Sequence, residues 1–352
     1  MIAEDAVSIA IIGAGWWASS VHLPALARYP GARVVAICDP NRERANSVAS
    51  AHSIAFTFAD VDELLAAGVT DAVIIATPHV SHYALARACL ESGVHVLVEK
   101  PMTLTADDAF SMVTMAERRN LHLSVGYTYQ YAATAQLVRD AVQSTIGELV
   151  QVIVEFTSNA AELYALADIP DDYPPDQPHP SAYSLGNGGG QAHTQLTHAI
   201  GMVCWVTGKQ IRDVVAFTDE RGLEVDVDDV AAFRFVGGGS GVAASTGSVG
   251  KGREVRHSVR YIGTERSVDQ NLLTAEVRIA GPGGKIEIIS PECQGNAYRA
   301  ERPAQAFVDL VRGRGSNLSP ARPAAATVAF VEAMLQSSRS AGSRTAVRQL
   351  PV

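Results

Sequence analysis

The chain has 352 residues, of which 47% are hydrophobic and 18% are charged, which is typical of a soluble globular protein large enough for two domains. The formal net charge of −9 comes without a long run of like charge, which excludes nucleic acid as the expected partner because phosphate contacts need clustered Lys and Arg. No apolar stretch approaches the length that spans a bilayer, and the acidic start lacks the features of a signal peptide, so no membrane partner is expected. Four cysteines lie far apart with no Cys-x-x-Cys pair, which predicts reduced thiols in a cytoplasmic protein: Cys38, Cys89, Cys204 and Cys293.

Short apolar runs alternate with helical stretches in the first part of the chain. Because these runs carry apolar residues on both faces, they predict a parallel sheet covered by helices on each side. The expected strands are residues 7–12, 33–38, 54–58, 72–76, 94–98 and 121–126. A helix is expected at 102–119, with Thr103 or Thr105 as its N-cap.

The turn after the first apolar run fits the dinucleotide fingerprint G-x-G-x-x-A, with Gly13, Gly15 and Ala18. Gly13 permits the tight turn, Gly15 lets the backbone approach a pyrophosphate, and Ala18 allows close packing of helix on strand. The N-terminus of the following helix then faces the phosphates with its unpaired N–H groups. The motif therefore predicts a bound dinucleotide.

An acidic residue, Asp39, ends the second predicted strand. In that position a carboxylate accepts hydrogen bonds from the adenine ribose hydroxyls and repels a 2′-phosphate. We therefore expect NAD as the cofactor, with NADP as the alternative because Arg42 and Arg44 lie close by. The structural alternative for Asp39 is a turn or N-cap role before Pro40.

Further side chains near the same edge of the predicted sheet are assigned to the cofactor. Trp16 and Trp17 are unusual in a phosphate loop, and one of them is expected to flank the nicotinamide or the substrate. Packing is the simpler role for either tryptophan. Thr77, Pro78 and His79 leave the fourth strand and are expected to touch the cofactor.

The tripeptide Glu99-Lys100-Pro101 ends the fifth predicted strand. Proline fixes φ and stops further strand pairing, so the lysine is held at the carboxyl edge of the sheet, where open α/β sheets bind ligands. A partly desolvated lysine shifts its pKa toward neutrality and exchanges protons. The alternative is an ordinary solvated ion pair. We assign Glu99 and Lys100 to the cofactor site, and Lys100 also to catalysis.

The second part of the chain carries strand-like runs that follow one another without long helices between them. Runs at 149–156, 214–217, 230–235, 242–246, 258–262, 274–279 and 285–289 predict a mostly antiparallel sheet. Helices at 302–314 and 323–340 are expected to close the chain. The long segment 158–187 is rich in Pro and Asp, and we expect it to act as a lid or as a contact with a neighbouring subunit.

An apolar helix expected at 190–206 carries a polar stripe. Four polar residues fall at i, i+3, i+4 and i+7 and so share one face: Gln191, Thr194, Gln195 and His198. Such a stripe needs water or a ligand, and three glycines just before it let a ligand approach. We expect His198 to line a site, a structural histidine being the alternative. His193 points elsewhere, and the spacing gives no metal site.

These motifs together resemble the glucose–fructose oxidoreductase / inositol dehydrogenase (Gfo/Idh/MocA) family over nearly the whole chain. The resemblance rests on the glycine turn, Asp39, Thr77-Pro78, Glu99-Lys100-Pro101, and the glycines that lead to His198. It implies an N-terminal Rossmann dinucleotide-binding domain at 1–126. It also implies a C-terminal α/β domain with an open, mainly antiparallel sheet at 127–352, for substrate binding and oligomerisation. A nicotinamide cofactor, sugar or cyclitol substrates, and homodimers or homotetramers follow from the same resemblance.

The family's catalytic lysine corresponds to Lys100, and its helix motif, an Asp four residues before a His, corresponds to Thr194 and His198. Thr194 cannot be an anionic partner for the histidine or the lysine, but it can orient a substrate hydroxyl. Gln130 stands near a position where many relatives carry arginine, which does not favour a negatively charged substrate. The residues assigned to the substrate are Lys100, Tyr127, Gln130, Gln191, Thr194 and His198.

The predicted reaction is reversible oxidation of a secondary alcohol on a sugar, polyol or related carbohydrate, with hydride transfer to the nicotinamide. Lys100 or His198 takes the hydroxyl proton and the other hydrogen-bonds the oxygen, with Thr194 beside them. One alternative is a redox-neutral isomerase or lyase that uses tightly bound NAD through a transient ketone. Another is a non-catalytic ligand-binding regulator on the same fold.

Overall fold

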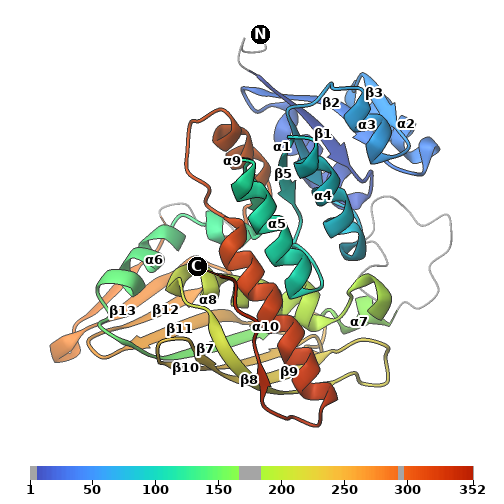
Figure 1. Cartoon of the computed structure of the whole chain (residues 1–352). Coiled ribbons are helices and arrows are strands. Elements are labelled where there is room, and N and C mark those ends of the chain that lie inside the picture. The colour runs from blue at the N-terminus through green and yellow to red at the C-terminus, as the bar shows by residue number, and fades with distance from the viewer. Residues whose placement is uncertain (1–5, 166–183, 292–296, 352) are drawn as a thin grey trace. The chain divides into compact units, whose positions relative to one another are not determined.

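The computed structural model describes residues 6–165, 184–291 and 297–351 (Figure 1). These residues divide into two compact units. The first holds residues 6–126 and 300–321, and the second holds residues 127–165, 184–291, 297–299 and 322–351. Most of the segment expected to act as a lid lies outside the described residues, as does Cys293.

The first unit is built on a six-stranded parallel sheet with the strand order β3-β2-β1-β4-β5-β6, as the alternating pattern predicts. The strands are β1 (Val7–Ile12), β2 (Ala32–Cys38), β3 (Phe56–Phe58), β4 (Ala72–Ile75), β5 (His95–Val98) and β6 (Leu123–Val125). The strand order reverses between β1 and β4. In open α/β sheets the ligand crevice lies at this switch point, outside the carboxyl ends of the strands.

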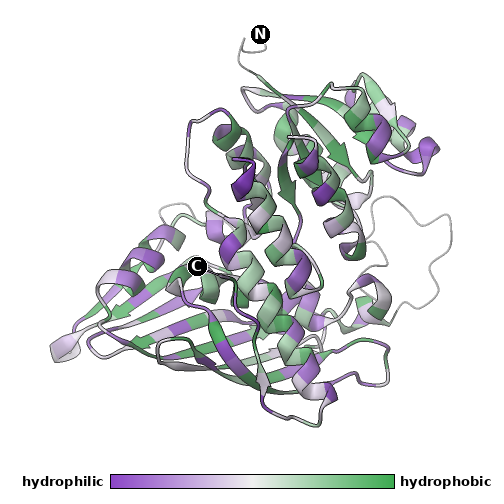
Figure 2. Ribbon diagram, viewed as in Figure 1, coloured by the Kyte–Doolittle hydropathy of each residue, from purple (hydrophilic) through white to green (hydrophobic). Residues whose placement is uncertain are grey.

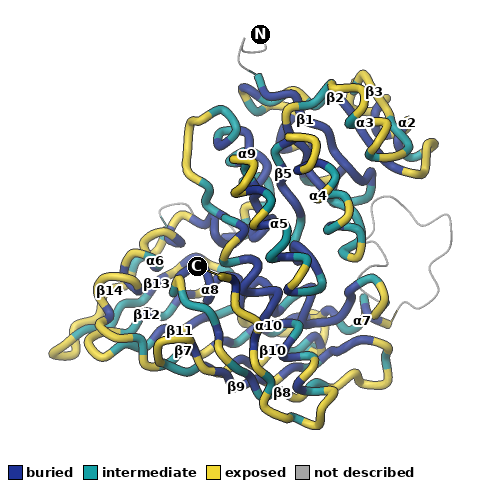
Figure 3. The backbone as a smooth tube through the Cα atoms, viewed as in Figure 1, coloured by how far each residue is buried: buried dark blue, intermediate teal, exposed yellow. Residues whose placement is uncertain are grey.

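The helices of this unit are α1 (Leu23–Ala27), α2 (Arg42–His52), α3 (Val61–Ala66), α4 (His82–Glu91), α5 (Ala106–Arg118) and α9 (Arg302–Val311), with a π-helical turn at Ala18–His22 before α1. Helix α5 begins at Ala106 and not at residue 102, because Thr103 donates to the Thr105 carbonyl and the Thr105 side chain then caps the helix. Figures 2 and 3 show the apolar strands buried beneath these helices. Helix α9 contacts α1 and β5, so this late segment belongs to the first unit and not with residues 127–299.

The second unit contains a nine-stranded sheet with the order β14-β13-β12-β11-β7-β10-β9-β8-β15. All neighbouring strands are antiparallel except β7 and β10, which confirms the mainly antiparallel sheet. The strands are β7 (Leu149–Thr157), β8 (Ile211–Asp219), β9 (Asp228–Phe235), β10 (Ser240–Thr246), β11 (His257–Gly263), β12 (Ser267–Asn271), β13 (Val277–Ala280), β14 (Ile286–Ile289) and β15 (Thr345–Ala346).

Strands β12 and β15 were not expected from the sequence. Strand β12 buries Val268 together with the polar Gln270, so its sequence lacks the apolar alternation that marks a strand. The run expected at 274–279 is shortened to β13, because Ala275 has φ +59 and stands in a turn. Strand β15 has two residues and is defined only by its pairing with β8.

Helices α6 (Ala135–Ser144), α8 (Thr197–Thr207) and α10 (Ala321–Arg339) lie on one face of this sheet (Figure 1). Helix α8 packs on β7 and β11, and Phe330 of α10 packs on Phe233 of β9 with ring centroids 5.2 Å apart. Short helices precede them: the 3₁₀ turn Thr128–Tyr131, α7 (Ala161–Tyr164) and the π-helical turn Ala192–Leu196, which runs into α8. Within the described residues, none of the helices combines the length and apolarity that crossing a membrane requires.

Candidate active site

The glycine turn after β1 has the geometry that the fingerprint predicts. Gly13 has φ +98, and a Cβ at this position would lie 2.4 Å from the Ala76 carbonyl oxygen, so only glycine fits. A Cβ on Gly15 would meet no atom of the described residues within 4 Å, so these residues leave open space beside the backbone at the N-terminus of the following helix. This shape fits the pyrophosphate of a dinucleotide.

The Asp39 side chain is hydrogen-bonded to the glycine turn, to Asn41 and to Arg44, and its contact with the adenine ribose stays a prediction. It is 3% exposed, and its Oδ2 accepts a 2.8 Å hydrogen bond from the Ala14 N–H of the glycine turn. Its Oδ1 accepts from the Asn41 N–H at 2.9 Å, while Asn41 itself caps α2. The Arg44 guanidinium donates to both oxygens, at 2.8 and 3.3 Å. The carboxylate is therefore fixed beside the nucleotide loop and partly neutralised by Arg44.

Glu99 is the centre of a hydrogen-bond cluster at the end of β5. Its Oε1 accepts from the Trp17 indole N–H at 2.8 Å and from His22 Nε2 at 3.0 Å. The Glu99 carboxylate also packs against Gly126: a Cβ added to Gly126 would lie only 2.6 Å from Glu99 Oε2. Trp17 therefore stands in the phosphate loop because it holds Glu99, and the ring of Trp16 packs 5.6 Å from it.

The two charged side chains of this tripeptide have shifted pKa values. Burial alone would raise the pKa of Glu99, but the hydrogen bond and charge of His22, together with Lys100, lower it overall. Burial lowers the pKa of Lys100 to about 8, and the charge of Glu99 limits this fall. The direction of this shift agrees with the prediction for a desolvated lysine, and a role of Lys100 in proton exchange stays a prediction.

The loop after β4 is joined to the loop that carries Lys100. The fully buried His82 has its ring nitrogens 2.8 Å from the Pro101 carbonyl oxygen and 3.0 Å from the Thr77 carbonyl oxygen. The Thr77 hydroxyl lies 2.7 Å from the Ser81 hydroxyl, and His79 begins the short 3₁₀ turn. The structure therefore holds Thr77, Pro78 and His79 at the carboxyl edge of the sheet, next to the Lys100-Pro101 turn.

In the second unit, His198 lies at the start of α8 inside a group of aromatic rings. The rings of Tyr127, Tyr129 and Tyr298 lie 6.3, 5.5 and 5.9 Å from it in edge-to-face arrangements. Phe156 stacks 6.3 Å away at an interplanar angle of 10°. The imidazole is 6% exposed, so it is held in a largely apolar environment.

Thr194 and Gln191 share a hydrogen-bond network with Tyr164, a residue that the sequence did not single out. The Tyr164 hydroxyl lies 2.7 Å from Thr194 Oγ1 and 3.0 Å from Gln191 Oε1. The Thr194 hydroxyl also donates to the Gly190 carbonyl at 2.7 Å, and Gln191 Nε2 donates to Ser245 at 2.8 Å. Protein groups therefore satisfy Gln191 and Thr194, two of the four residues of the polar stripe for which the sequence predicted water or a ligand.

A buried carboxyl pair supports the turn before this helix. Asp226 accepts from the Ala192 N–H at 2.6 Å, and a Cβ on Gly190 (φ +97) would lie 2.2 Å from its Oδ1. Asp229 is 1% exposed, and neither of its carboxyl oxygens has a hydrogen-bond partner within the described residues. Burial, followed by the charge of Asp226, raises the pKa of Asp229 well above its ordinary value, and burial also raises the pKa of Asp226.

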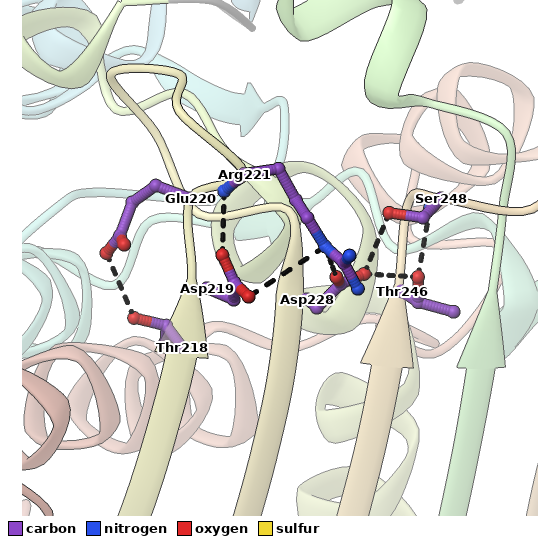
Figure 4. Close-up of polar contacts among 7 residues, drawn as sticks. All are labelled: Thr218, Asp219, Glu220, Arg221, Asp228, Thr246 and Ser248. Atoms are coloured by element: carbon purple, nitrogen blue, oxygen red, sulfur yellow. Dashed lines mark hydrogen bonds and ion pairs between the residues drawn. The ribbon is translucent and has the colours of Figure 1, made fainter.

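The loop that carries Asp226 is anchored at the ends of three strands (Figure 4). Arg221 forms an ion pair with Asp228 at the start of β9, and its N–H donates to Asp219 at 2.8 Å. Asp228 also accepts from the hydroxyls of Thr246 and Ser248 at the end of β10. Charged and hydroxyl groups thus fix the β8–β9 loop against the neighbouring strand.

Tyr127 and Gln130 make hydrogen bonds to α8. The Tyr127 hydroxyl lies 2.9 Å from Thr197 Oγ1, and Gln130 Nε2 donates to the Gly201 carbonyl at 3.2 Å. A Cβ on Gly201 would lie 2.9 Å from the Tyr127 ring, so the tyrosine packs directly on the helix backbone. These contacts hold the helix that carries His198, and the contact of Tyr127 and Gln130 with substrate remains a prediction.

Comparison with known proteins identifies the family of the chain. Residues 7–127 match the model described as "Oxidoreductase family, NAD-binding Rossmann fold", and residues 135–269 match the GFO/IDH/MocA C-terminal domain. Glucose-6-phosphate 3-dehydrogenase of Bacillus subtilis is 32% identical over 154 residues, covering 44% of this chain and 43% of that protein. Inositol 2-dehydrogenase of Arthrobacter is also 32% identical over 154 residues, covering 42% and 44%. The chain thus spans less than half the length of these curated relatives.

Solved structures extend the similarity of fold to the whole chain. An oxidoreductase domain protein from Kribbella flavida superimposes with a TM-score of 0.80 and 20% sequence identity, covering 99% of this chain and 100% of that one. The two family models cover both units of the present structure, on a Rossmann sheet and a mainly antiparallel sheet. The chain belongs to the Gfo/Idh/MocA oxidoreductase family.

Proposed function

We propose that this protein is an NAD(P)-dependent oxidoreductase that transfers a hydride between the nicotinamide and a secondary alcohol of a sugar, polyol or related carbohydrate. The observation that carries the proposal is Lys100, whose pKa burial lowers to about 8 at the carboxyl end of β5. A lysine with that pKa can accept a hydroxyl proton near neutral pH. The names of the relatives, which include glucose-6-phosphate 3-dehydrogenase and inositol 2-dehydrogenase, support a carbohydrate substrate.

The first unit supplies the groups that would hold the dinucleotide. The loop at Gly13 and Gly15 fits the pyrophosphate, and Asp39 fits the adenine ribose, so NAD is favoured over NADP. Trp16, Thr77, Pro78 and His79 are proposed to complete this site, with Trp17 acting through Glu99. When bound, the cofactor supplies the hydride chemistry, and the protein supplies positioning and the proton path.

The second unit supplies the groups proposed to meet the substrate. We assign to His198 a hydrogen bond to the reacting oxygen while Lys100 takes its proton. Thr194 is hydrogen-bonded to Tyr164 and Gly190, so we propose that it orients a substrate hydroxyl from a fixed position. The buried Gln191 forms hydrogen bonds with Tyr164 and Ser245, so we propose that it positions Tyr164, which in turn contacts Thr194.

We also propose that the protein is a homodimer or homotetramer assembled through the outer face of the nine-stranded sheet. Helices cover the other face, whereas large apolar side chains project from this one. Phe217 and Val230 are direct cross-strand partners and are 61% and 57% exposed, and the partners Val242 and Ile153 continue the stripe. Exposed large apolar side chains gathered on neighbouring strands favour an interaction site, and a second copy of the chain is the proposed partner.

We propose the cytoplasm as the site of action. Cys38, Cys89 and Cys204 are buried free thiols, and burial raises the pKa of each to about 12. Such protonated thiols suit a reducing compartment.

A substrate panel tests the proposed function. Monosaccharides, polyols, cyclitols and aldonates are assayed for reduction of NAD and of NADP, with Lys100→Ala as the inactive reference. We expect stoichiometric NADH from at least one neutral carbohydrate, and about 10²–10⁴-fold less turnover from the variant with little change in NAD affinity. Product formation without net NADH would instead support the redox-neutral reaction. Binding without turnover across the whole panel would support the regulator.

A further inference from the structure

We propose that Tyr129 determines substrate specificity by accepting a hydrogen bond from a substrate hydroxyl next to the one that reacts, and that His257 positions it for this role. The inference rests on the proposed function, because it names a further contact within that site. None of the sequence motifs points to either residue, since Tyr129 lies in a short 3₁₀ turn and His257 begins β11.

Tyr129 lies beside the imidazole proposed to bind the reacting oxygen. Its ring centroid is 5.5 Å from that of His198, at an interplanar angle of 79°. The ring of Tyr298 lies 5.1 Å from Tyr129 on the same aromatic cluster. A substrate oxygen bound by His198 would therefore bring neighbouring groups of the same sugar ring within reach of this phenol.

The hydrogen-bond partners of His257 fix which way the Tyr129 hydroxyl points. His257 Nε2 lies 3.1 Å from the Thr157 carbonyl oxygen, which can only accept, so Nε2 carries the hydrogen. His257 Nδ1 lies 2.9 Å from the Tyr129 hydroxyl. Burial lowers the pKa of His257 to about 4, so at pH 7 the ring is neutral and Nδ1 is an acceptor. The tyrosine must therefore donate its only hydrogen to His257.

Packing holds His257 in this orientation. Its ring stacks on Phe156 with centroids 3.7 Å apart and an interplanar angle of 12°. Phe156 in turn stacks on His198, so one phenylalanine supports both imidazoles. His257 thus acts on the substrate through Tyr129 and is a positioning residue.

Because the Tyr129 hydroxyl donates its hydrogen to His257, Tyr129 can act toward a substrate only as a hydrogen-bond acceptor. Its oxygen retains lone pairs and can accept from a hydroxyl, but it has no hydrogen left to donate to a carboxylate or phosphate. Burial also raises the pKa of Tyr129, so the phenol stays neutral. The position therefore favours a neutral sugar or cyclitol with a free hydroxyl there, and disfavours an anionic group.

The test compares Tyr129→Phe with the wild type on parent and deoxy compounds. The probes are methyl α-D-glucopyranoside, levoglucosan and myo-inositol, each with its monodeoxy analogues. Tyr261→Phe is the matched control, because this buried tyrosine lies on β11 and its hydroxyl has no hydrogen-bond partner within the described residues. We expect Tyr129→Phe to lower kcat/KM on the preferred parent about tenfold, and to leave it unchanged on the one analogue that lacks the bonded hydroxyl.

Two variants of His257 separate positioning from packing. His257→Phe keeps an aromatic ring against Phe156 but removes the acceptor, so it should reproduce the loss on the parent compound. His257→Asn offers an amide oxygen near the place of Nδ1 and should recover part of the activity. If His257 only fills space against Phe156, the smaller asparagine, which stacks less well, should not restore activity on the parent compound.

The outcome that overturns the inference is an equal loss for Tyr129→Phe on the parent and on every monodeoxy analogue, or no loss at all. Failure of the proposed function shows differently, as absence of turnover in the wild type. In that case the same comparison is made by binding of the unreacted compounds to enzyme loaded with NADH. A wild type that binds none of the probes, or a Tyr129→Phe variant that binds parent and analogues with unchanged affinity, rejects the role of Tyr129.

Discussion

The pH dependence of alcohol oxidation should report the ionisation of Lys100. With a pKa of about 8, about one tenth of these side chains are neutral at pH 7, compared with about one in 3,000 for an ordinary lysine. Only the neutral amine can accept the hydroxyl proton, so kcat/KM for oxidation should rise as pH increases through about 8 and then level off. Lys100→Arg stays protonated throughout, so it should be about 10²–10⁴-fold slower without this rise.

A second variant tests whether Glu99 sets that ionisation. The charge of Glu99 raises the pKa of Lys100, against the larger effect of burial. Glu99→Gln removes the charge but can still accept from Trp17 and His22, so the rise should move to a pH below about 8. Lys251→Arg, which alters an exposed lysine, is the control and should leave the profile unchanged.

The assay is initial-rate NADH formation with the best substrate of the panel, from about pH 6 to about pH 10 in buffers of constant ionic strength. NAD affinity is measured separately for each variant, so that a cofactor defect is not mistaken for a proton-transfer defect. A flat profile, or a rise that Glu99→Gln does not move, would refute Lys100 as the proton acceptor. A rise that Glu99→Gln does not move would favour His198 as the proton acceptor.

Two other substitutions test the supports of the two proposed subsites. Gly190→Ala places a Cβ against Asp226, so the free energy of unfolding measured in urea should fall by about 1–3 kcal/mol. Gly250→Ala is the control: among the described residues the nearest atom to its Cβ is 3.8 Å away, so the free energy of unfolding should change by less than about 0.5 kcal/mol. Equal effects of the two would contradict the close contact with Asp226. Asp39→Asn keeps an acceptor for the glycine turn but leaves Arg44 without its carboxylate, so the ratio of kcat/KM with NADP to that with NAD should rise about tenfold or more. An unchanged ratio in steady-state kinetics would show that Asp39 does not select the cofactor.

The sequence alone was sufficient for the features that depend on local chemistry. The glycine turn at Gly13 follows from a positive φ that only glycine adopts without strain, and the parallel sheet follows from short runs that are apolar on both faces. The lysine at the end of β5 was identified because a proline fixes the backbone directly after it. Each of these patterns involves only a few neighbouring residues, so the sequence alone reveals it.

The sequence was less informative where an element is stabilised by distant partners. Strand β12 has little apolar alternation, because the polar Gln270 is one of its buried side chains. Helix α9 follows the second unit along the chain but packs in the first. The polar stripe around Thr194 was interpreted as open to water or ligand, whereas Tyr164 and Ser245 form hydrogen bonds with Thr194 and Gln191.

Only the tertiary structure decided which side chains tune the chemistry. Trp17 and Glu99 are 82 residues apart, and Tyr129 and His257 are 128 apart, yet each pair is joined by a single hydrogen bond. The motif predicts the direction of the shift in the pKa of Lys100, but its extent depends on burial in the packed fold. Spacing along a chain specifies turns and helix faces, but desolvation and the direction of a shared hydrogen depend on which groups the packed fold places in contact.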